Sequence, residues 1–118
     1  MPHIVIVGPV SVEHIYNQFE PIYEQTADTV IKAQEAFINT KKTKLLLECV
    51  VVEDRASRAF YMIVSQGKNS VTVRLDPLTD PEKSPCVKHL LALVGQRIKA
   101  RHPGSQYGTH NLEGFVLP

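Results

Sequence analysis

Pro2 is the first residue of the chain whose position could carry chemistry. Met1 is normally removed before a residue as small as proline, and Pro2 would then expose a secondary amine. An ordinary α-amino group has a pKa near ~7.7–8.0, and burial next to a cation lowers that pKa because both effects disfavour the ammonium. The amine at the mouth of a strand over residues 4–7 could therefore act as a general base. The alternative is a common start dipeptide with no chemical role.

The histidines and cysteines give weaker signals. The five histidines lack the i, i+4 pairing of a helical zinc site, so we expect no metal and no cofactor. His102 and His110 could meet in a glycine-containing loop, but we expect them to be separate surface residues. Cys86 lies where a helix should begin, which lowers a thiol pKa, and His89 follows one turn later. The simpler interpretation is that Cys86 and Cys49 are unpaired structural thiols in a reducing cytoplasm.

Composition limits the class of protein. The chain has 118 residues, 43% hydrophobic and 21% charged, which is typical of one globular domain. Thirteen basic and twelve acidic residues leave a net charge of +1, so nucleic acid is not an expected partner. No apolar run approaches the ~18 residues of a membrane-spanning helix, and no signal peptide is recognisable at the N-terminus. We therefore expect a cytoplasmic protein that does not bind membranes.

The elements that would position Pro2 follow from hydrophobic spacing. A strand over residues 4–7 should lead into a helix capped by Ser11, and the apolar spacing extends this helix to Ile38. Pro21 lies inside that segment, so we expect a kink there, or two helices with Pro21 opening the second. Strands follow over three segments, 45–52, 59–64 and 70–75, and the last two form a hairpin. A final helix should begin after Ser84 with Pro85 in its first turn.

This order, β-α-β-β-β-α, predicts an α+β fold, in which a four-stranded mixed sheet carries two helices on one face. We expect residues 1–104 to form the single domain and residues 105–118 to be a C-terminal tail, with Phe115-Val116-Leu117 as a short edge or intersubunit strand. The predicted core comprises Ile4, Ile6, Ile15, Phe19, Val30, Leu46, Val50, Tyr61, Ile63, Val71, Val73, Leu90, Leu91 and Val94. Leu45, Leu47, Val51, Phe60 and Met62 would then occupy the opposite face.

The opening of the chain resembles the tautomerase superfamily, whose members use an N-terminal proline. The residues that carry this resemblance are Met1-Pro2-His3 before an apolar strand, and His14-Ile15 followed by Pro21. They are similar to the carboxymethyl-hydroxymuconate isomerase group and to small bacterial proteins of the same fold with no assigned activity. The resemblance covers residues 2–38 in some detail, and residues 45–98 only by the order of elements.

The resemblance implies proton transfer on a small anionic keto–enol substrate. Pro2 would be the catalytic base, and Arg74 with Lys44 would bind the substrate carboxylate by charge-assisted hydrogen bonds. It also implies a homo-oligomer, with a trimer favoured, which agrees with an apolar second sheet face too large to leave uncovered. The alternative function is a non-catalytic α+β module that binds ligands or other proteins.

Overall fold

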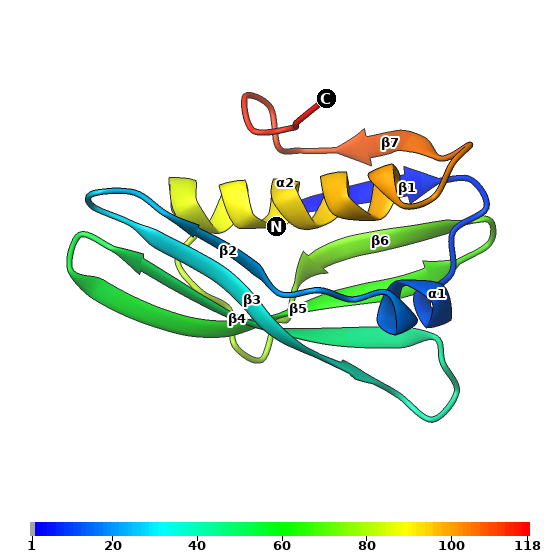
Figure 1. Ribbon diagram of the computed structural model, residues 1–118, viewed down its shortest axis with the longest axis horizontal. Coiled ribbons are helices and arrows are strands. Elements are labelled where there is room, and N and C mark those ends of the chain that lie inside the picture. Colours follow the sequence, from blue (N-terminus) through cyan, green and yellow to red (C-terminus); the bar gives the residue numbers. More distant parts are fainter. Residues whose placement is uncertain (1) are drawn as a thin grey trace.

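The computed structural model of the protein describes residues 2–118 and shows one sheet of seven strands curled around a long helix (Figure 1). The elements are β1 (His3–Val7), α1 (Val12–Asn17), β2 (Ile22–Gln25), β3 (Val30–Ile38), β4 (Lys44–Glu53), β5 (Ala56–Gly67), β6 (Ser70–Leu75), α2 (Pro85–Ala100) and β7 (Gln106–His110). The strand order is β2-β3-β4-β5-β6-β1-β7, and every neighbouring pair is antiparallel.

The predicted four-stranded mixed sheet of an α+β sandwich is therefore wrong. The sheet has seven strands, and none of its pairs is parallel. The cause lies between β1 and β4, where the predicted long helix is mostly a β-hairpin. Without that helix there is no parallel crossover, and β1 instead lies between β6 and β7.

The first helix begins as predicted but is short. Ser11 caps α1, and its Oγ accepts a hydrogen bond from the backbone N–H of His14 at 3.0 Å. The helix ends at Asn17, and β2 begins at Ile22, directly after Pro21. Proline cannot supply the backbone donor that a helix interior needs, so this residue separates a helix from a strand rather than kinking one helix.

Helical spacing was misleading in β3 because this strand contains a bulge. Ile31 and Ala33 are buried two residues apart, as in any strand. The pairing with β4 shifts register between Ala33 and Glu35, so the next buried residue is Ala36, three positions on. One extra residue in a strand thus produces a step of three between buried residues, as a helix would. The residues that predicted the helix here, Val30, Ala33 and Phe37, instead belong to both faces of the strand.

The second half of the chain agrees with its sequence signals. The three strands predicted there correspond to β4, β5 and β6, which are joined by tight turns. Asp54 and Arg55 have φ of 53° and 63°, the left-handed conformation that a two-residue hairpin turn requires. α2 begins as predicted, with Pro85 in its first turn and the Ser84 side chain accepting from the N–H of Val87 at 3.3 Å.

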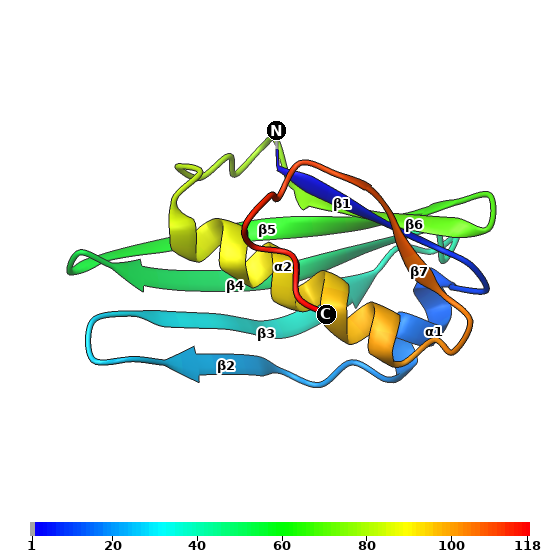
Figure 2. The same cartoon turned by 90° about the horizontal axis from the view of Figure 1, so that it is seen from above.

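The long helix α2 lies in the concave face of the sheet (Figure 2). Its fully or nearly fully buried residues are Val87, Leu90, Leu91, Ala92, Leu93, Val94, Gly95 and Ile98. Gly95 permits the closest approach, because a Cβ added there would lie only 3.0 Å from Cγ2 of Ile4 on β1. α2 is therefore packed closely against the middle of the sheet. Its N-terminal end lies near the β4–β5 turn, and its C-terminal end lies near the segment between α1 and β2.

The predicted core is right for β1, β6 and α2 but reversed for β4 and β5. Leu46, Val50, Tyr61 and Ile63 were expected inside, yet all four lie on the convex face and are half-buried. The concave face instead carries Leu45, Leu47, Val51, Phe60 and Met62. Both faces of β4 are apolar, so alternation alone is satisfied by either orientation. Val30 and Phe19, also expected in the core, are only half-buried.

The C-terminal segment, residues 105–118, covers the outer side of α2 (Figure 2). Its strand is β7, which pairs with β1 of the same chain. The prediction of a strand at Phe115-Val116-Leu117 is wrong, because these residues follow β7 without regular structure. Leu112 is buried, and the hydroxyl of Tyr107 donates to the carbonyl oxygen of Leu117 at 2.7 Å. The tail therefore completes the layer above the helix within one chain.

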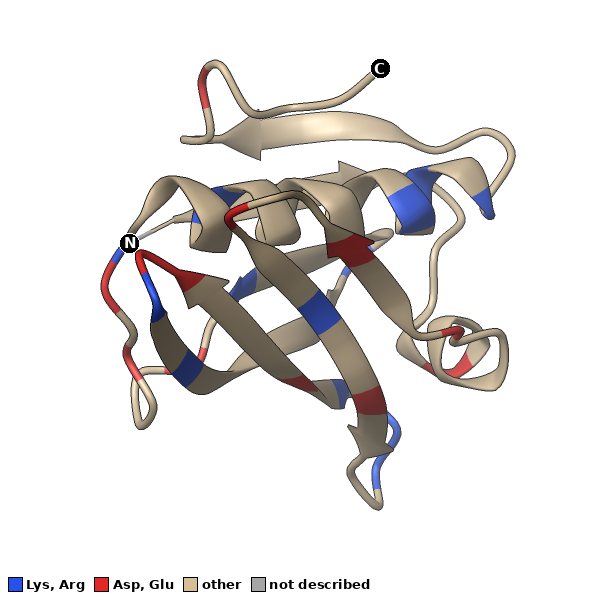
Figure 3. Cartoon of the chain, turned by 60° about the vertical axis from the view of Figure 1, so that its left-hand side comes forward, with Lys and Arg blue, Asp and Glu red and all other residues tan. Residues whose placement is uncertain are grey.

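Charges of both signs are distributed over the strands and loops (Figure 3). Exposed ion pairs connect distant segments, as between Lys42 and Glu13 at 3.1 Å. Over residues 2–118, the structure contains no helix with both the length and the apolar character needed to span a membrane.

Candidate functional site

The three residues that the resemblance assigned to catalysis do not lie together. Pro2 is buried directly before β1 and shares the alternation of the buried Ile4. Arg74 is exposed on β6 between two buried residues, so it lies on the convex face. Lys44 is exposed at the start of β4, opposite Ser65 of β5. The sheet therefore separates the predicted base from both predicted cations, and proton transfer by Pro2 stays a prediction from the resemblance.

A different set of residues surrounds a cavity at the C-terminal end of α2. The cavity has a volume of about 40 Å³ and lies between α1, the segment before β2, β4 and α2. Six of its lining side chains are apolar: Ile15, Phe19, Ile22, Leu47, Val94 and Ile98. The polar lining residues are Gln18, Glu20, Arg97, Arg101 and His102. One water needs roughly 10–15 Å³ of such space, so the cavity can admit a short alkyl segment or the edge of a ring.

Local sequence features explain why an opening forms there. α1 ends at Asn17, and residues 18–21 cross to β2 without regular structure. Val94 and Ile98 lie one turn apart on α2 and form one wall. Leu47, from the concave face of β4, contributes a buried side chain from the sheet. The irregular connection cannot pack as closely as a helix or strand would, so the space between these walls stays open.

Two arginines border this cavity, but only one of them pairs with other described residues. The guanidinium of Arg101 lies 3.3 Å from the carboxylate of Glu20 and also donates to the carbonyl oxygen of Gln18. Arg97 lies one turn earlier on the same helical face. Within residues 2–118 the Arg97 side chain has no hydrogen-bonding or ion-pairing partner. Arg101 thus closes one side of the opening, whereas Arg97 leaves a half-buried cation at its edge.

His102, which lines the same cavity, carries an unsatisfied polar atom in its ring. The residue is only 6% exposed, and its Nδ1 lies 2.7 Å from the carbonyl oxygen of Ile98. A carbonyl can only accept, so Nδ1 carries a proton, and in the neutral ring Nε2 is an acceptor. That Nε2 is buried without a partner among the described residues. Leaving a buried polar atom unpaired costs about 1–3 kcal/mol, which requires an explanation.

The His102 ring also contacts a second histidine. The rings of His102 and His14 meet edge to face, with centroids 4.7 Å apart. His102 and His14 border a wider surface hollow with Ser11 and Arg101. His102 thus lies between the apolar cavity and a surface hollow with a mixed lining, where Pro9 and Pro103 accompany the polar residues.

The sequence pattern did not single out these residues. His102 was interpreted as a surface residue, and Arg97 and Arg101 were assigned no role. A signal was present, because Arg97 and Arg101 are four residues apart beside the apolar positions Val94 and Ile98. That spacing places two cations next to an apolar stripe, but the stripe alone does not reveal that the facing loop leaves it uncovered.

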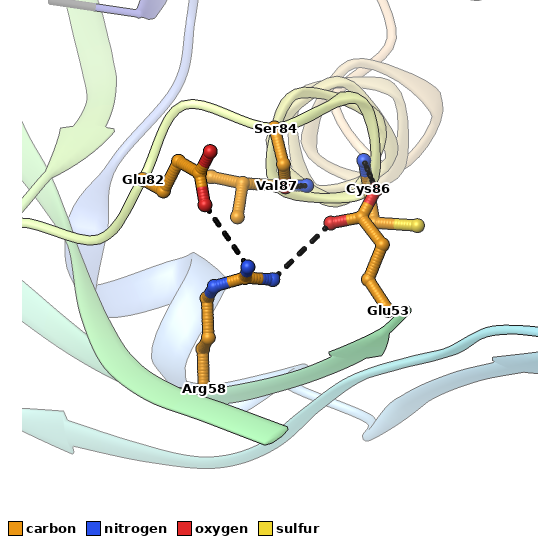
Figure 4. Close-up of polar contacts among 6 residues, drawn as sticks. All are labelled: Glu53, Arg58, Glu82, Ser84, Cys86 and Val87. Carbon is orange, nitrogen blue, oxygen red and sulfur yellow. Dashed lines mark hydrogen bonds and ion pairs between the residues drawn. The ribbon is translucent and has the colours of Figure 1, made fainter. Parts of the chain in front are cut away.

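The other end of α2 contains a second polar cluster, drawn in Figure 4. Oε2 of Glu53 accepts from the backbone N–H of Cys86 at 3.2 Å, and Oε1 lies 3.5 Å from Arg58. Arg58 also pairs with Glu82 at 2.9 Å. The Ser84 side chain caps the helix. Each polar group in this cluster has a partner, which identifies it as a tether between the β4–β5 hairpin and the helix.

The ionisation of this cluster agrees with a structural role. Burial disfavours the charged form of Glu53, but hydrogen bonds from Ser84 and Cys86 and the charge of Arg58 outweigh burial and lower the pKa of Glu53. Burial, together with hydrogen bonding to Glu53 and its charge, raises the pKa of the Cys86 thiol. The thiol is therefore not activated by the helix N-terminus, contrary to what the sequence position of Cys86 allowed.

Comparison of the chain with protein-family models, with curated proteins and with solved structures finds no match. The site must therefore be interpreted from its own geometry.

Proposed function

We propose that this protein is a small-molecule binding module whose ligand enters the cavity at the C-terminal end of α2. The ligand class is a short amphipathic carboxylate: an apolar end for the cavity, and a carboxylate for Arg97. The observation that carries the proposal is the buried, unpartnered Nε2 of His102, a residue that lines a cavity whose edge also holds an unpaired cation. The proposal keeps the cytoplasmic location expected from the sequence.

Each part of such a ligand matches one feature of the site. A short alkyl segment would contact Phe19, Leu47 and Val94, where burial contributes ~25 cal/mol per Å² of apolar area. A carboxylate at the opening would accept charge-assisted hydrogen bonds from Arg97. Nε2 of His102 is buried, so a hydroxyl beside that carboxylate would donate to it after a small movement of the ring on binding. A short 2-hydroxy acid therefore fits the site better than the corresponding plain acid or alcohol.

Titration followed by NMR tests this proposal, with hexanoate, 2-hydroxyhexanoate and 1-hexanol as probes. We expect affinity to fall from 2-hydroxyhexanoate to hexanoate to 1-hexanol, with the shifted amides in α1, the start of β2 and the last two turns of α2. Arg97→Gln should weaken hexanoate by about tenfold or more and leave 1-hexanol unchanged. Val94→Phe should fill the cavity and abolish binding of all three.

Two controls make the result decisive. Lys68→Gln removes an exposed cation in the turn between β5 and β6 and should leave all three affinities unchanged. Thermal unfolding of each variant shows whether a lost affinity merely reflects a lost fold. Equal affinity of hexanoate for the wild type and Arg97→Gln, or shifts mapping elsewhere, would overturn the proposal.

A further inference from the structure

The convex face of the sheet carries an apolar row that no other part of residues 2–118 covers. Phe37 on β3 pairs in register with Leu46 on β4, and Leu46 pairs with Ile63 on β5. Phe37 is 50% exposed, and Leu46 and Ile63 are half-buried. Tyr61 extends the apolar area toward the next row. These residues are contiguous across three strands, unlike the scattered apolar residues that any surface has.

Acidic residues lie on one side of this apolar row. Glu35 on β3 and Glu48 on β4 are directly opposite each other, and like charges in that position are destabilising. Gln34 donates one hydrogen bond to Glu48 at 2.6 Å. Within residues 2–118 neither carboxylate forms an ion pair. The two carboxylates therefore form an uncompensated anionic site at the β3–β4 side of the row.

A cation without a partner among residues 2–118 lies at the β6 end of the apolar row. Arg74 on β6 is opposite Ile63, so it continues the row that begins at Phe37. Its guanidinium has no hydrogen bond or ion pair to any residue from 2 to 118, and the residue is exposed. Glu48 is opposite Tyr61, one row away. The unpaired cation and the anionic site thus lie on opposite sides of β5, with Tyr61 and Ile63 between them.

This arrangement is complementary to itself under a two-fold rotation. The two-fold axis would lie in the plane of the convex face and cross β5 between Tyr61 and Ile63. It would run perpendicular to the line that joins Arg74 and Glu48 of one copy. Arg74 of each copy then falls over Glu48 of the other, and the two apolar rows meet at the centre. Neighbouring strands lie ~4.8 Å apart and each residue advances ~3.4 Å along a strand. With these values the strands of one copy would cross those of the other at roughly 70°, near the orthogonal class of sheet packing.

We propose that the convex face binds a second copy of this chain in a two-fold dimer, with Arg74 of each copy paired to Glu48 and Glu35 of the other. The contact is isologous, so one patch serves both partners and closes without forming a filament. Curvature carries the edges of the two sheets apart, which confines the contact to the central rows and favours a reversible, micromolar dimer. The two-fold symmetry also distinguishes it from the trimer that the tautomerase resemblance implies.

Charge exchange tests the dimer by sedimentation velocity over roughly 1–200 µM protein. The wild type should shift from monomer to dimer across this range, and raised salt should weaken the shift. Arg74→Glu should weaken association by at least tenfold because it places like charges in contact. Glu48→Arg should do the same. The double variant with both substitutions should recover association, because it restores opposite charges across the axis.

Lys68→Glu is the matched control, since it makes the same charge change in the exposed turn between β5 and β6. It should leave association unchanged. Circular dichroism on every variant separates a lost interface from a lost fold, and the recovery in the double variant cannot arise from unfolding. A wild type that stays monomeric to the highest concentration, or a double variant that associates no better than either single one, would overturn the proposal.

Discussion

The two ends of α2 are built from similar residues but differ in whether those residues have partners. At the N-terminal end, Glu53 binds the backbone of Cys86 and the guanidinium of Arg58, which also binds Glu82. At the C-terminal end, Nε2 of His102 has no partner among the described residues. One end is thus closed by partners within the chain, whereas the other keeps an unpaired group that the ligand of the proposed function would satisfy.

Removing the N-terminal tether should have the largest effect. Glu53→Ala leaves the N–H of Cys86 without its acceptor and Arg58 with one carboxylate fewer. The side chain of Glu53 is only 12% exposed, so we expect a loss of about 2–3 kcal/mol in the free energy of unfolding. Urea denaturation measures this loss. Glu82→Ala, whose side chain is 70% exposed, is the control and should cost less than ~1 kcal/mol.

Acid should weaken the same end of the helix. The pKa of Glu53 in the folded chain lies below its usual value of 4.5, so the unfolded chain binds a proton more readily. Its contribution to stability is therefore complete above pH 4.5 and is lost as the pH falls through the lowered pKa. Denaturation midpoints of the wild type should decline over this interval more steeply than those of Glu53→Gln. Parallel pH profiles would show that Glu53 does not carry the effect.

The opposite end should respond differently to loss of its polar group. His102→Phe removes the unpartnered Nε2, and the carbonyl oxygen of Ile98 still accepts from the N–H of Arg101 at 3.3 Å. We therefore expect the free energy of unfolding to stay level or to rise by up to about 1 kcal/mol. Binding of 2-hydroxyhexanoate should nevertheless weaken. A variant destabilised as strongly as Glu53→Ala would show that His102 is structural.

The smallest effect concerns thiol chemistry. Burial raises the pKa of Cys49 to about 12, and burial with Glu53 raises the pKa of Cys86. Neither thiol should react appreciably with Ellman's reagent near neutral pH in the folded chain, whereas both should react in urea. Comparing the two time courses checks this, and Cys86→Ser identifies which residue reacts. Rapid modification of native Cys86 would mean that the tether is less closed than its contacts indicate.

Local sequence determined the second half of the fold. Apolar runs separated by polar turns predicted β4, β5 and β6, and Ser84-Pro85 predicted where α2 begins. These signals are read correctly because each depends on neighbouring residues only: a turn conformation, a cap, or an alternation. Ser11 likewise predicted where α1 begins, although its end was placed too late.

Tertiary structure decided what local patterns left ambiguous. The bulge at Gln34 exists only where β3 pairs with β4, so its step of three could not be distinguished from helical spacing in the sequence. The choice between Leu46 and Leu47 as the inward residue depended on which face α2 covers, because both faces of β4 are apolar. Both the bulge in β3 and the inward face of β4 depend on contacts between residues far apart in the chain.

The candidate site followed the same division. The final helix, predicted to begin after Ser84, carries Arg97 in its last turn, and Arg101 and His102 follow its end. Whether these three residues are solvated or border a cavity depended on residues 18–21, some eighty positions earlier in the chain. Those residues connect α1 to β2 without regular structure, and residues 18–20 line the same cavity. A periodic pattern determines which side of a helix is apolar, but only the packed chain determines which part of that side is left open, because an opening is the space between elements rather than a property of any one of them.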